Sequence, residues 1–272
     1  MGEFKPARGG SRERNRGWTA QQNRPELQEN LIEGRNAVTE ALKSGRTIDK
    51  LFFSEGSTDH GLGRLVSLAK EAGAVTVGVD RRKLDQMSPT GAHQGVIAMA
   101  AAHTYSTIDD MLLRAEERGE APLLILLDEL SDPHNLGAIL RTGECAGAHG
   151  VIIPKRRSVG LTAVVAKASA GAIEYMPVAR VANLTSTIQE LKARGIWVFG
   201  TAADGATPMH QADLTGPTAI VIGSEGEGMG RLVAENCDFK VSIPMRGRIS
   251  SLNASAAAAV LLYEAVRQRR CV

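Results

Sequence analysis

The stretch PLLILLDELSDPHNLGAILRTGECAGAHGVIIP, residues 122–154, decides the fold of this chain. It opens with the uninterrupted apolar run LLILLD at 123–128, which is typical of a strand buried on both faces. A helical stretch at 135–148 follows, and a second apolar run, VII, occupies 151–153. A buried strand, a helix and a second buried strand in this order predict a parallel β–α–β unit.

The same alternation continues toward the C-terminus. Further apolar runs lie at 196–200, 219–223 and 239–243. Helical stretches separate or follow them, at 161–170, 184–194, 228–236 and 253–270. The pattern predicts an α/β fold with a mostly parallel sheet covered by helices. Because ligands gather at the carboxyl ends of parallel strands, the loops after these strands are the candidate site.

The residues before this sheet predict a smaller α/β unit. A helix with Ile32 on its apolar face is expected to end at Gly45, and strands are expected at 51–54, 75–80 and 95–101. The first 28 residues are rich in arginine and glycine and poor in apolar residues, which predicts a disordered basic tail. This tail is either a solubilising extension or a phosphate-binding arm. The expected organisation is a tail at 1–28, a smaller α/β domain at 29–104, a linker at 105–120 and a larger domain at 121–272.

Composition excludes several classes of protein. The chain has 272 residues, 43% of them hydrophobic, and a net charge of +2. No run of about 18 apolar residues predicts a membrane span, and no signal peptide is evident. Three cysteines without a CxxC pair favour the cytoplasm over an oxidising compartment. The histidines form no HExxH motif, so no metal site is expected, and neither a GxSxG elbow nor a phosphate-binding P-loop occurs.

The first candidate loop is DELSDPHNLGAILRT at 128–142. Asn135 is expected to cap the helix that follows, and Gly137 permits a close backbone approach. Arg141 lies further along this helix, where it could point at a phosphate near the helix N-terminus. The other interpretation is a surface arginine paired with Glu144.

The second candidate loop is IGSEGEGM at 222–229, which follows a predicted strand. Its glycine spacing, G-x-x-G-x-G, is typical of a backbone cradle but differs from the dinucleotide pattern G-x-G-x-x-G. Glu225 and Glu227 would repel a pyrophosphate and would suit a cationic or hydroxyl-bearing ligand. The other interpretation is a turn with exposed acids. Thr201, after another strand, could border the same pocket.

The third candidate segment is IPMRGRISSLNASAAAAVLLYEAV at 243–266. Its strand end is followed by small polar residues and then by a helix whose first turns are nearly all alanine or serine. Small residues allow another backbone to come close, although ordinary helix packing also explains them. Arg246 and Arg248 add positive charge beside the predicted pocket.

NLGAILRT, IGSEGEGM and IPMRGRISSLNAS, in this order, resemble the three motifs of the SpoU/TrmH family of RNA ribose 2′-O-methyltransferases, in the SPOUT class. The motif-bearing similarity covers about residues 122–270. AKASAGAIEYMPVARVANL at 166–184 is similar to the family's bacterial enzyme for large-subunit rRNA guanosine. LIEGRNAVTEAL at 31–42 resembles the start of that enzyme's RNA substrate-binding domain.

The resemblance implies a C-terminal trefoil knot, a homodimer with a shared active site, and S-adenosylmethionine as the methyl donor, with no metal. Carried onto this chain, the cofactor-binding positions are Gly223, Ile243 and Leu252, with Thr201, Met245 and Ser251 as neighbours. The family's functional polar residues correspond to Asn135, Arg141, Glu225 and Asn253.

The expected reaction is methylation of a guanosine ribose in 23S rRNA. Arg141 would clamp a phosphate and stabilise the developing alkoxide, because a guanidinium is a poor base. Which group takes the proton stays open. RNA contacts are expected from the N-terminal domain, Arg246, Arg248 and KRRS at 155–158, although KRRS also fits a solvated loop. Other hypotheses are a tRNA or another rRNA nucleotide as substrate, a non-catalytic ribosome-assembly factor, and a nucleotide-dependent oxidoreductase, which the glycine spacing disfavours.

Overall fold

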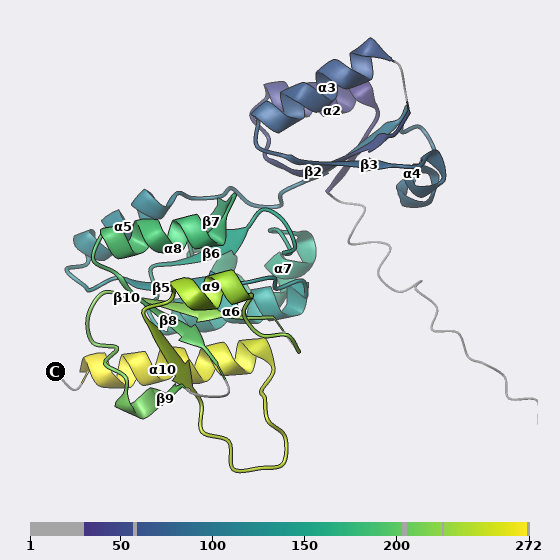
Figure 1. The fold of residues 1–272 in the computed structure, drawn as a ribbon. Helices are drawn as coiled ribbons and strands as arrows, with labels where there is room; N and C mark the ends of the chain where they lie inside the picture. The colour runs from purple at the N-terminus through teal and green to yellow at the C-terminus, as the bar shows by residue number, and fades with distance from the viewer. Residues whose placement is uncertain (1–29, 57–58, 203–205, 225, 271–272) are drawn as a thin grey trace, which may run out of the picture.

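A computed structural model of the chain describes residues 30–56, 59–202, 206–224 and 226–270. The predicted tail at 1–28 therefore lies outside the described residues. The described chain contains a four-stranded sheet and a seven-stranded sheet (Figure 1). The fold class predicted from the sequence, α/β with a parallel sheet after a smaller α/β unit, is confirmed.

The smaller sheet has the strand order β1-β4-β2-β3. Its strands are β1 Leu31–Glu33, β2 Ile48–Ser54, β3 Val75–Val79 and β4 Val96–Ala100. Strand β4 runs antiparallel to β1 and β2, whereas β2 and β3 are parallel. The associated helices are α2 Arg35–Lys43, α3 His60–Glu71 and α4 Arg81–Met87. Buried side chains such as Val38, Leu51 and Leu65 form a core of this unit's own.

The observed elements of this unit differ from the predicted ones in two places. Ile32 lies in β1, opposite Ala98 of β4, and not in the first helix. Gly34, at φ +87°, turns the chain between that strand and α2. Gly45, at φ +77°, follows the end of α2, as the sequence predicts. Helix α4 was not predicted; it begins where the Asp80 carboxylate accepts a hydrogen bond from the Lys83 N–H.

The larger sheet has the strand order β7-β6-β5-β10-β8-β11-β9, and every pairing between its strands is parallel. Its strands are β5 Leu123–Leu127, β6 Gly150–Pro154, β7 Val178–Val181, β8 Trp197–Thr201, β9 Thr207–Pro208, β10 Thr218–Ile222 and β11 Phe239–Ser242. All five residues of β5 and of β10 are buried, which agrees with their uninterrupted apolar sequences.

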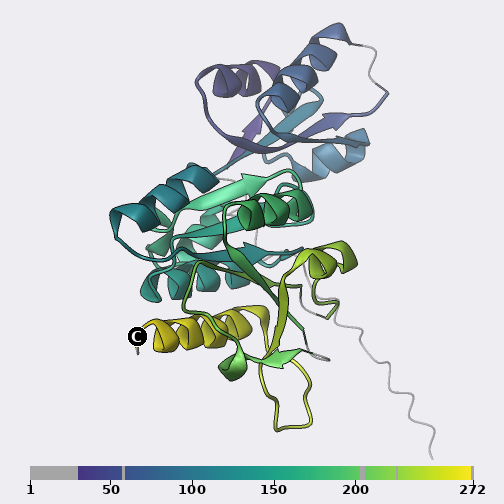
Figure 2. The same ribbon diagram turned by 60° about the vertical axis from the view of Figure 1, so that its left-hand side comes forward.

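Helices cover both faces of the larger sheet (Figures 1 and 2). Ile125 and Leu127 of β5 pack with α6, α7 and α10, whereas Leu124 and Leu126 pack with α5, α8 and α9. The α-helices are α5 Ile108–Glu117, α6 Pro133–Cys145, α7 Ala163–Ala168, α8 Leu184–Ala193, α9 Arg231–Asn236 and α10 Ala254–Arg270. Two 3₁₀ turns occur at η1 Ala172–Glu174 and η2 Met209–Gln211.

Two contacts fix the helices that border the candidate site. A Cβ atom on Gly137 of α6 would lie 2.4 Å from the Cβ of Ala168 in α7, so the predicted close approach is confirmed. At the far end of α10, the Arg269 guanidinium donates hydrogen bonds to carbonyl oxygens in the segments that lead into the central strands β5 and β10, those of Ala121, Pro122, Leu214 and Gly216. These bonds hold α10 along the sheet with its N-terminus at the candidate site.

Candidate functional site

A cavity of about 680 Å³ opens at the carboxyl ends of β8, β10 and β11. This volume lies within the range of small-molecule sites. The lining comes from the second and third candidate segments and from the end of β8. It includes all six positions predicted to bind a cofactor: Thr201, Gly223, Ile243, Met245, Ser251 and Leu252. The topology therefore brings together residues that are more than forty positions apart in the sequence.

Gly223 shapes one wall of the cavity. A Cβ atom at this position would lie 2.3 Å from the carbonyl carbon of Gly228 and 2.4 Å from the nitrogen of Met229. The loop turns back because Ser224 and Gly228 exchange backbone hydrogen bonds of 2.9 and 3.1 Å. Gly228 adopts φ +72°, a conformation that favours glycine. The glycine cradle predicted from the sequence is thus present, whereas Glu225 lies outside the described residues.

Asp128 anchors this loop, and the sequence analysis did not assign it a role. Its carboxylate accepts a 2.8 Å hydrogen bond from the Gly230 N–H, and its own N–H donates to the carbonyl of Ile222. The residue is 6% exposed, and burial raises the pKa of its carboxyl group. The available signal was an acid placed directly after a fully apolar strand, since such an acid lies at the carboxyl edge of the sheet.

Asn135 and Asn253 join the first and third candidate segments. The prediction that Asn135 caps α6 is wrong, because the Asp132 side chain accepts the hydrogen bond from His134 N–H and Asn135 lies inside the helix. Asn135 is 5% exposed, and its Oδ1 accepts a 3.0 Å hydrogen bond from Asn253 Nδ2.

Asn253 also organises the start of α10. Its Oδ1 accepts hydrogen bonds from the backbone nitrogens of Ser255 and Ala256, at 2.9 and 3.3 Å, and from the Ser255 hydroxyl. One side chain therefore caps the alanine-rich helix, lines the cavity and holds Asn135. This arrangement positions the first turn of α10 at the mouth of the cavity.

Arg141 is not among the described residues that line the cavity. It is exposed on α6, six positions after Asn135, and six residues correspond to a rotation of about 240° around a helix. Within one chain, the structure thus links Asn135 to the cavity through Asn253, whereas Arg141 is not part of the cavity lining. The edge of the cavity also carries partly exposed apolar side chains, Met245 and Leu252.

The described residues contain neither a candidate metal centre nor a candidate membrane span. No group of three or more histidine, cysteine, aspartate or glutamate side chains is placed to hold a metal ion there. Among the helices of that part of the chain, none combines the length and apolar character needed to cross a membrane.

Comparison with known families gives two matches. Residues 122–263 match the model of the SpoU rRNA Methylase family, and residues 31–106 match the model for RNA 2′-O ribose methyltransferase substrate binding. The first match contains every residue that lines the cavity, the first two candidate segments and the third segment as far as residue 263. The chain belongs to the SpoU/TrmH family of RNA methyltransferases.

Relatives of similar length support this assignment. A putative TrmH family tRNA/rRNA methyltransferase, YacO, from Bacillus subtilis is 53% identical over 90% of this chain and 98% of its own. A putative TrmH family tRNA/rRNA methyltransferase from Staphylococcus haemolyticus is 47% identical over 90% of this chain and 98% of its own.

Solved structures also resemble the chain. The SpoU methyltransferase AviRb from Streptomyces viridochromogenes, in complex with AdoMet, has a TM-score of 0.57 and 26% identity, covering 92% of this chain and 96% of that one. An AdoMet-bound rRNA methyltransferase from Sinorhizobium meliloti has a TM-score of 0.55 and 25% identity, covering 87% and 86%.

Proposed function

We propose that the protein transfers a methyl group from S-adenosylmethionine to the ribose 2′-hydroxyl of a guanosine in 23S rRNA. The observation that carries this proposal is the cavity lined by all six predicted cofactor positions and joined to Asn135 through Asn253. The choice of large-subunit rRNA is supported by the resemblance of residues 166–184 to the bacterial enzyme for that RNA. This substrate would place the reaction in the cytoplasm.

The residues around the cavity fit S-adenosylmethionine. The close packing of Gly223 against residues 228–229 leaves backbone groups as the lining of that wall. Backbone groups of Gly223, Ile243 and Leu252 would hold the cofactor, with Thr201, Met245 and Ser251 beside it. When bound, the cofactor supplies a methyl group on a sulfonium centre, which has a good leaving group. We also propose that the segment around this cavity forms the trefoil knot that the family resemblance implies.

Arg141 would act on the RNA from a second copy of the chain. It is exposed and does not line the cavity of its own chain, so a homodimer that places Arg141 of one copy at the cavity of the other would complete the site. A guanidinium stays protonated at neutral pH, so Arg141 would donate hydrogen bonds to a phosphate and to the ribose oxygen as that oxygen loses its proton. Asn135 and Asn253 would hold the adjoining helix ends in place, with Glu225 in the intervening loop.

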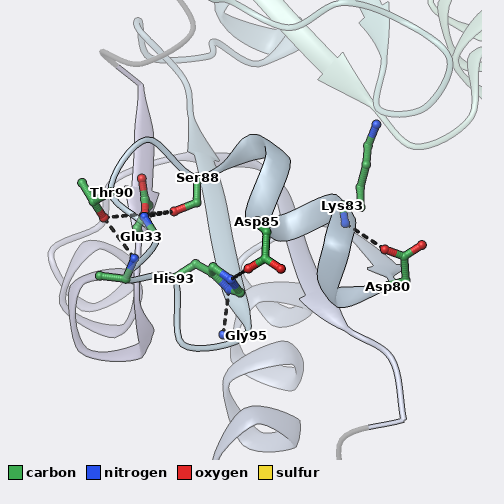
Figure 3. Close-up of polar contacts among 10 residues, drawn as sticks. Glu33, Asp80, Lys83, Asp85, Ser88, Thr90, His93 and Gly95 are labelled. Carbon is green, nitrogen blue, oxygen red and sulfur yellow. Dashed lines mark hydrogen bonds and ion pairs between the residues drawn. The ribbon is translucent and has the colours of Figure 1, made fainter.

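RNA would also contact the four-stranded unit. Its loop at 88–95 is held by side-chain hydrogen bonds: Glu33 accepts from Ser88 and Thr90, and the buried His93 contacts Asp85 and the Gly95 N–H (Figure 3). A preorganised loop costs little entropy when RNA binds. On the larger unit, RNA contacts would come from Arg246, Arg248 and residues 155–158.

A tRNA substrate is the second candidate, because the relatives at 53% and 47% identity carry both tRNA and rRNA in their names. A ribosome-assembly factor without catalysis would not need a cavity of this size with these residues around it.

Two measurements test the proposal. Calorimetry should detect binding of S-adenosylmethionine at micromolar concentration, and the absence of binding would refute the enzymatic function. Mapping of 2′-O-methyl groups in rRNA and tRNA from a strain without the gene should reveal one missing guanosine methyl group in 23S rRNA. Retention of every rRNA methyl group with loss of one tRNA methyl group would favour the second candidate.

A further inference from the structure

A buried ion pair connects the two sheets. Asp49 is the second residue of β2, and Arg180 lies in β7, the edge strand of the larger sheet. Their side chains are 8% and 7% exposed, and Arg180 Nη1 lies 2.6 Å from Asp49 Oδ1. Arg180 Nη2 also donates to the carbonyl oxygens of Asp49 and Lys155. In Figure 1 the smaller sheet lies on the β7 side of the larger one.

Tyr105 closes this contact from the segment that joins the sheets. Its hydroxyl donates a 2.9 Å hydrogen bond to Asp49 Oδ1 and accepts a 3.0 Å hydrogen bond from the Leu161 N–H. The Arg180 guanidinium carbon lies 5.6 Å from the centre of the Tyr105 ring. A Cβ atom on Gly160 would lie 2.2 Å from Asp49 Oδ2, so the loop fits against the carboxylate without spare room.

The ion pair joins two units that have separate apolar cores. The four-stranded unit has its own cluster of buried apolar side chains. The two clusters of the larger sheet include no residue of the four-stranded unit. Burial of a charge is costly, and burial raises the pKa of Asp49 while Arg180 opposes that rise. A buried ion pair therefore adds little net stability compared with apolar packing, but its directional bonds specify one geometry.

A chain of contacts leads from the ion pair to the candidate site. The loop at 155–161 accepts one hydrogen bond from Arg180 at the Lys155 carbonyl, and its Val159 N–H and Ser158 hydroxyl donate to the Leu130 carbonyl. Leu130 lies in the loop that leads into α6, the helix of Asn135 and Arg141. The loop at 155–161 continues into α7, which packs directly on α6 at Gly137.

We propose that Asp49, Arg180 and Tyr105 form a positioning clasp that holds the four-stranded unit in the orientation at which RNA bound there reaches the cavity. This inference rests on the proposed RNA methyltransferase function. The clasp residues act through orientation and do not touch the reacting atoms. Loosening the clasp should therefore slow methyl transfer to RNA without weakening the binding of either substrate.

The test compares Asp49→Asn, Arg180→Gln and the double variant with the full-length wild-type protein. Glu71→Gln is the matched control, because Glu71 is an exposed acid on α3 of the same unit. The probe is total RNA from a strain without the gene, with S-adenosylmethionine labelled in its methyl group. Each single variant should lower kcat about ten- to a hundred-fold, the effect of a misplaced substrate. The dissociation constants for RNA and for the cofactor should stay within about three-fold, or roughly 0.7 kcal/mol, of the wild-type values.

The double variant should be no slower than the slower single variant, since the two residues act as one unit. Small-angle scattering should show a broader distribution of interatomic distances for the variants than for the wild-type and control proteins. Additive losses, an unchanged kcat, or RNA affinity that falls together with kcat would overturn the clasp. Absence of methyl transfer by the wild-type protein would instead refute the proposed function. In that case scattering still tests the clasp, and unchanged scattering would overturn it.

Discussion

Asn253 Nδ2 lies 3.0 Å from Asn135 Oδ1, and this hydrogen bond joins two helix ends that are 118 residues apart in the sequence. Because Asn253 also caps α10, one amide holds the cavity wall, the start of that helix and the buried end of α6. A single side chain, that of Asn253, therefore links α6 to α10 at the candidate site.

Replacing this amide tests the connection. Asn253→Ala removes the cap and the bond to Asn135, so the free energy of unfolding should fall by about 1–2 kcal/mol. Asn253→Asp keeps the capping oxygen but not the donor, so it should retain only the capping part of this free energy while methyl transfer is lost. Urea unfolding and a labelled-methyl assay measure the two effects. Full activity of Asn253→Asp would contradict the role given to the Nδ2 group.

Gly223→Ala should block the cavity. The added Cβ atom would meet the backbone at 228–229 at 2.3–2.4 Å, so the loop must shift. The dissociation constant for S-adenosylmethionine should rise by about ten-fold or more, measured by calorimetry. Gly216→Ala is the control, since a Cβ atom at Gly216 meets nothing within 4 Å. Equal affinities of the two variants would show that the cradle does not bind the cofactor.

Arg141→Ala should abolish turnover and leave the affinity for S-adenosylmethionine nearly unchanged, because Arg141 does not line the cavity of its own chain. If a second copy supplies this arginine, co-expression with Gly223→Ala should restore activity at a cofactor concentration too low for the Gly223→Ala protein alone. Random pairing leaves one working site in half of the dimers, so about a quarter of the wild-type rate is expected. An inactive mixture with proven heterodimers would place Arg141 in the same chain as the cavity that it serves.

The lowered pKa of Glu264 predicts how the stability of the protein depends on pH. Hydrogen bonds from Arg267 and Gln268 to its carboxylate lower its pKa from 4.5 to about 2. A lowered pKa in the folded state stabilises the protein above pH 4.5, and this contribution is lost as the pH falls toward about 2. Glu264→Gln should cost about 1–2 kcal/mol at neutral pH and flatten the stability curve across that window.

Thermal unfolding between pH 7 and about pH 2 measures this difference. Glu71→Gln serves as the control because its side chain is exposed on α3. Parallel stability curves for wild type and Glu264→Gln across the acid window would contradict the role of the carboxylate.

The sequence predicts the larger sheet well, for physical reasons. Strands buried on both faces need uninterrupted apolar runs, and β5 and β10 have them. Strands β7 and β9 lack such runs, and their pairing comes from neighbours distant in the sequence. Strand β1 has only three residues, all half-buried, so local periodicity could not separate it from the following helix.

In the candidate site, too, some features could be predicted from the sequence and others could not. The meeting of the chain segments at the carboxyl ends of β8, β10 and β11 could be predicted from parallel topology, whereas the six cofactor positions came from the family resemblance. The roles of Asp128 and Asn135 depend on partners in other segments, Gly230 and Asn253, and local rules gave Asn135 the wrong role. Asp49 carries no local signal, because the predicted strand began at residue 51 and an acid before it is expected to be exposed until Arg180 is placed beside it.

The separate apolar cores of the two sheets have a consequence for the evolution of such enzymes. A chain built this way can change which RNA it addresses by altering the smaller unit and the few polar side chains at the joint, while the methyl-transfer chemistry stays intact. Exchange of that unit between relatives, joint residues included, should therefore yield folded hybrids whose target follows the transplanted part.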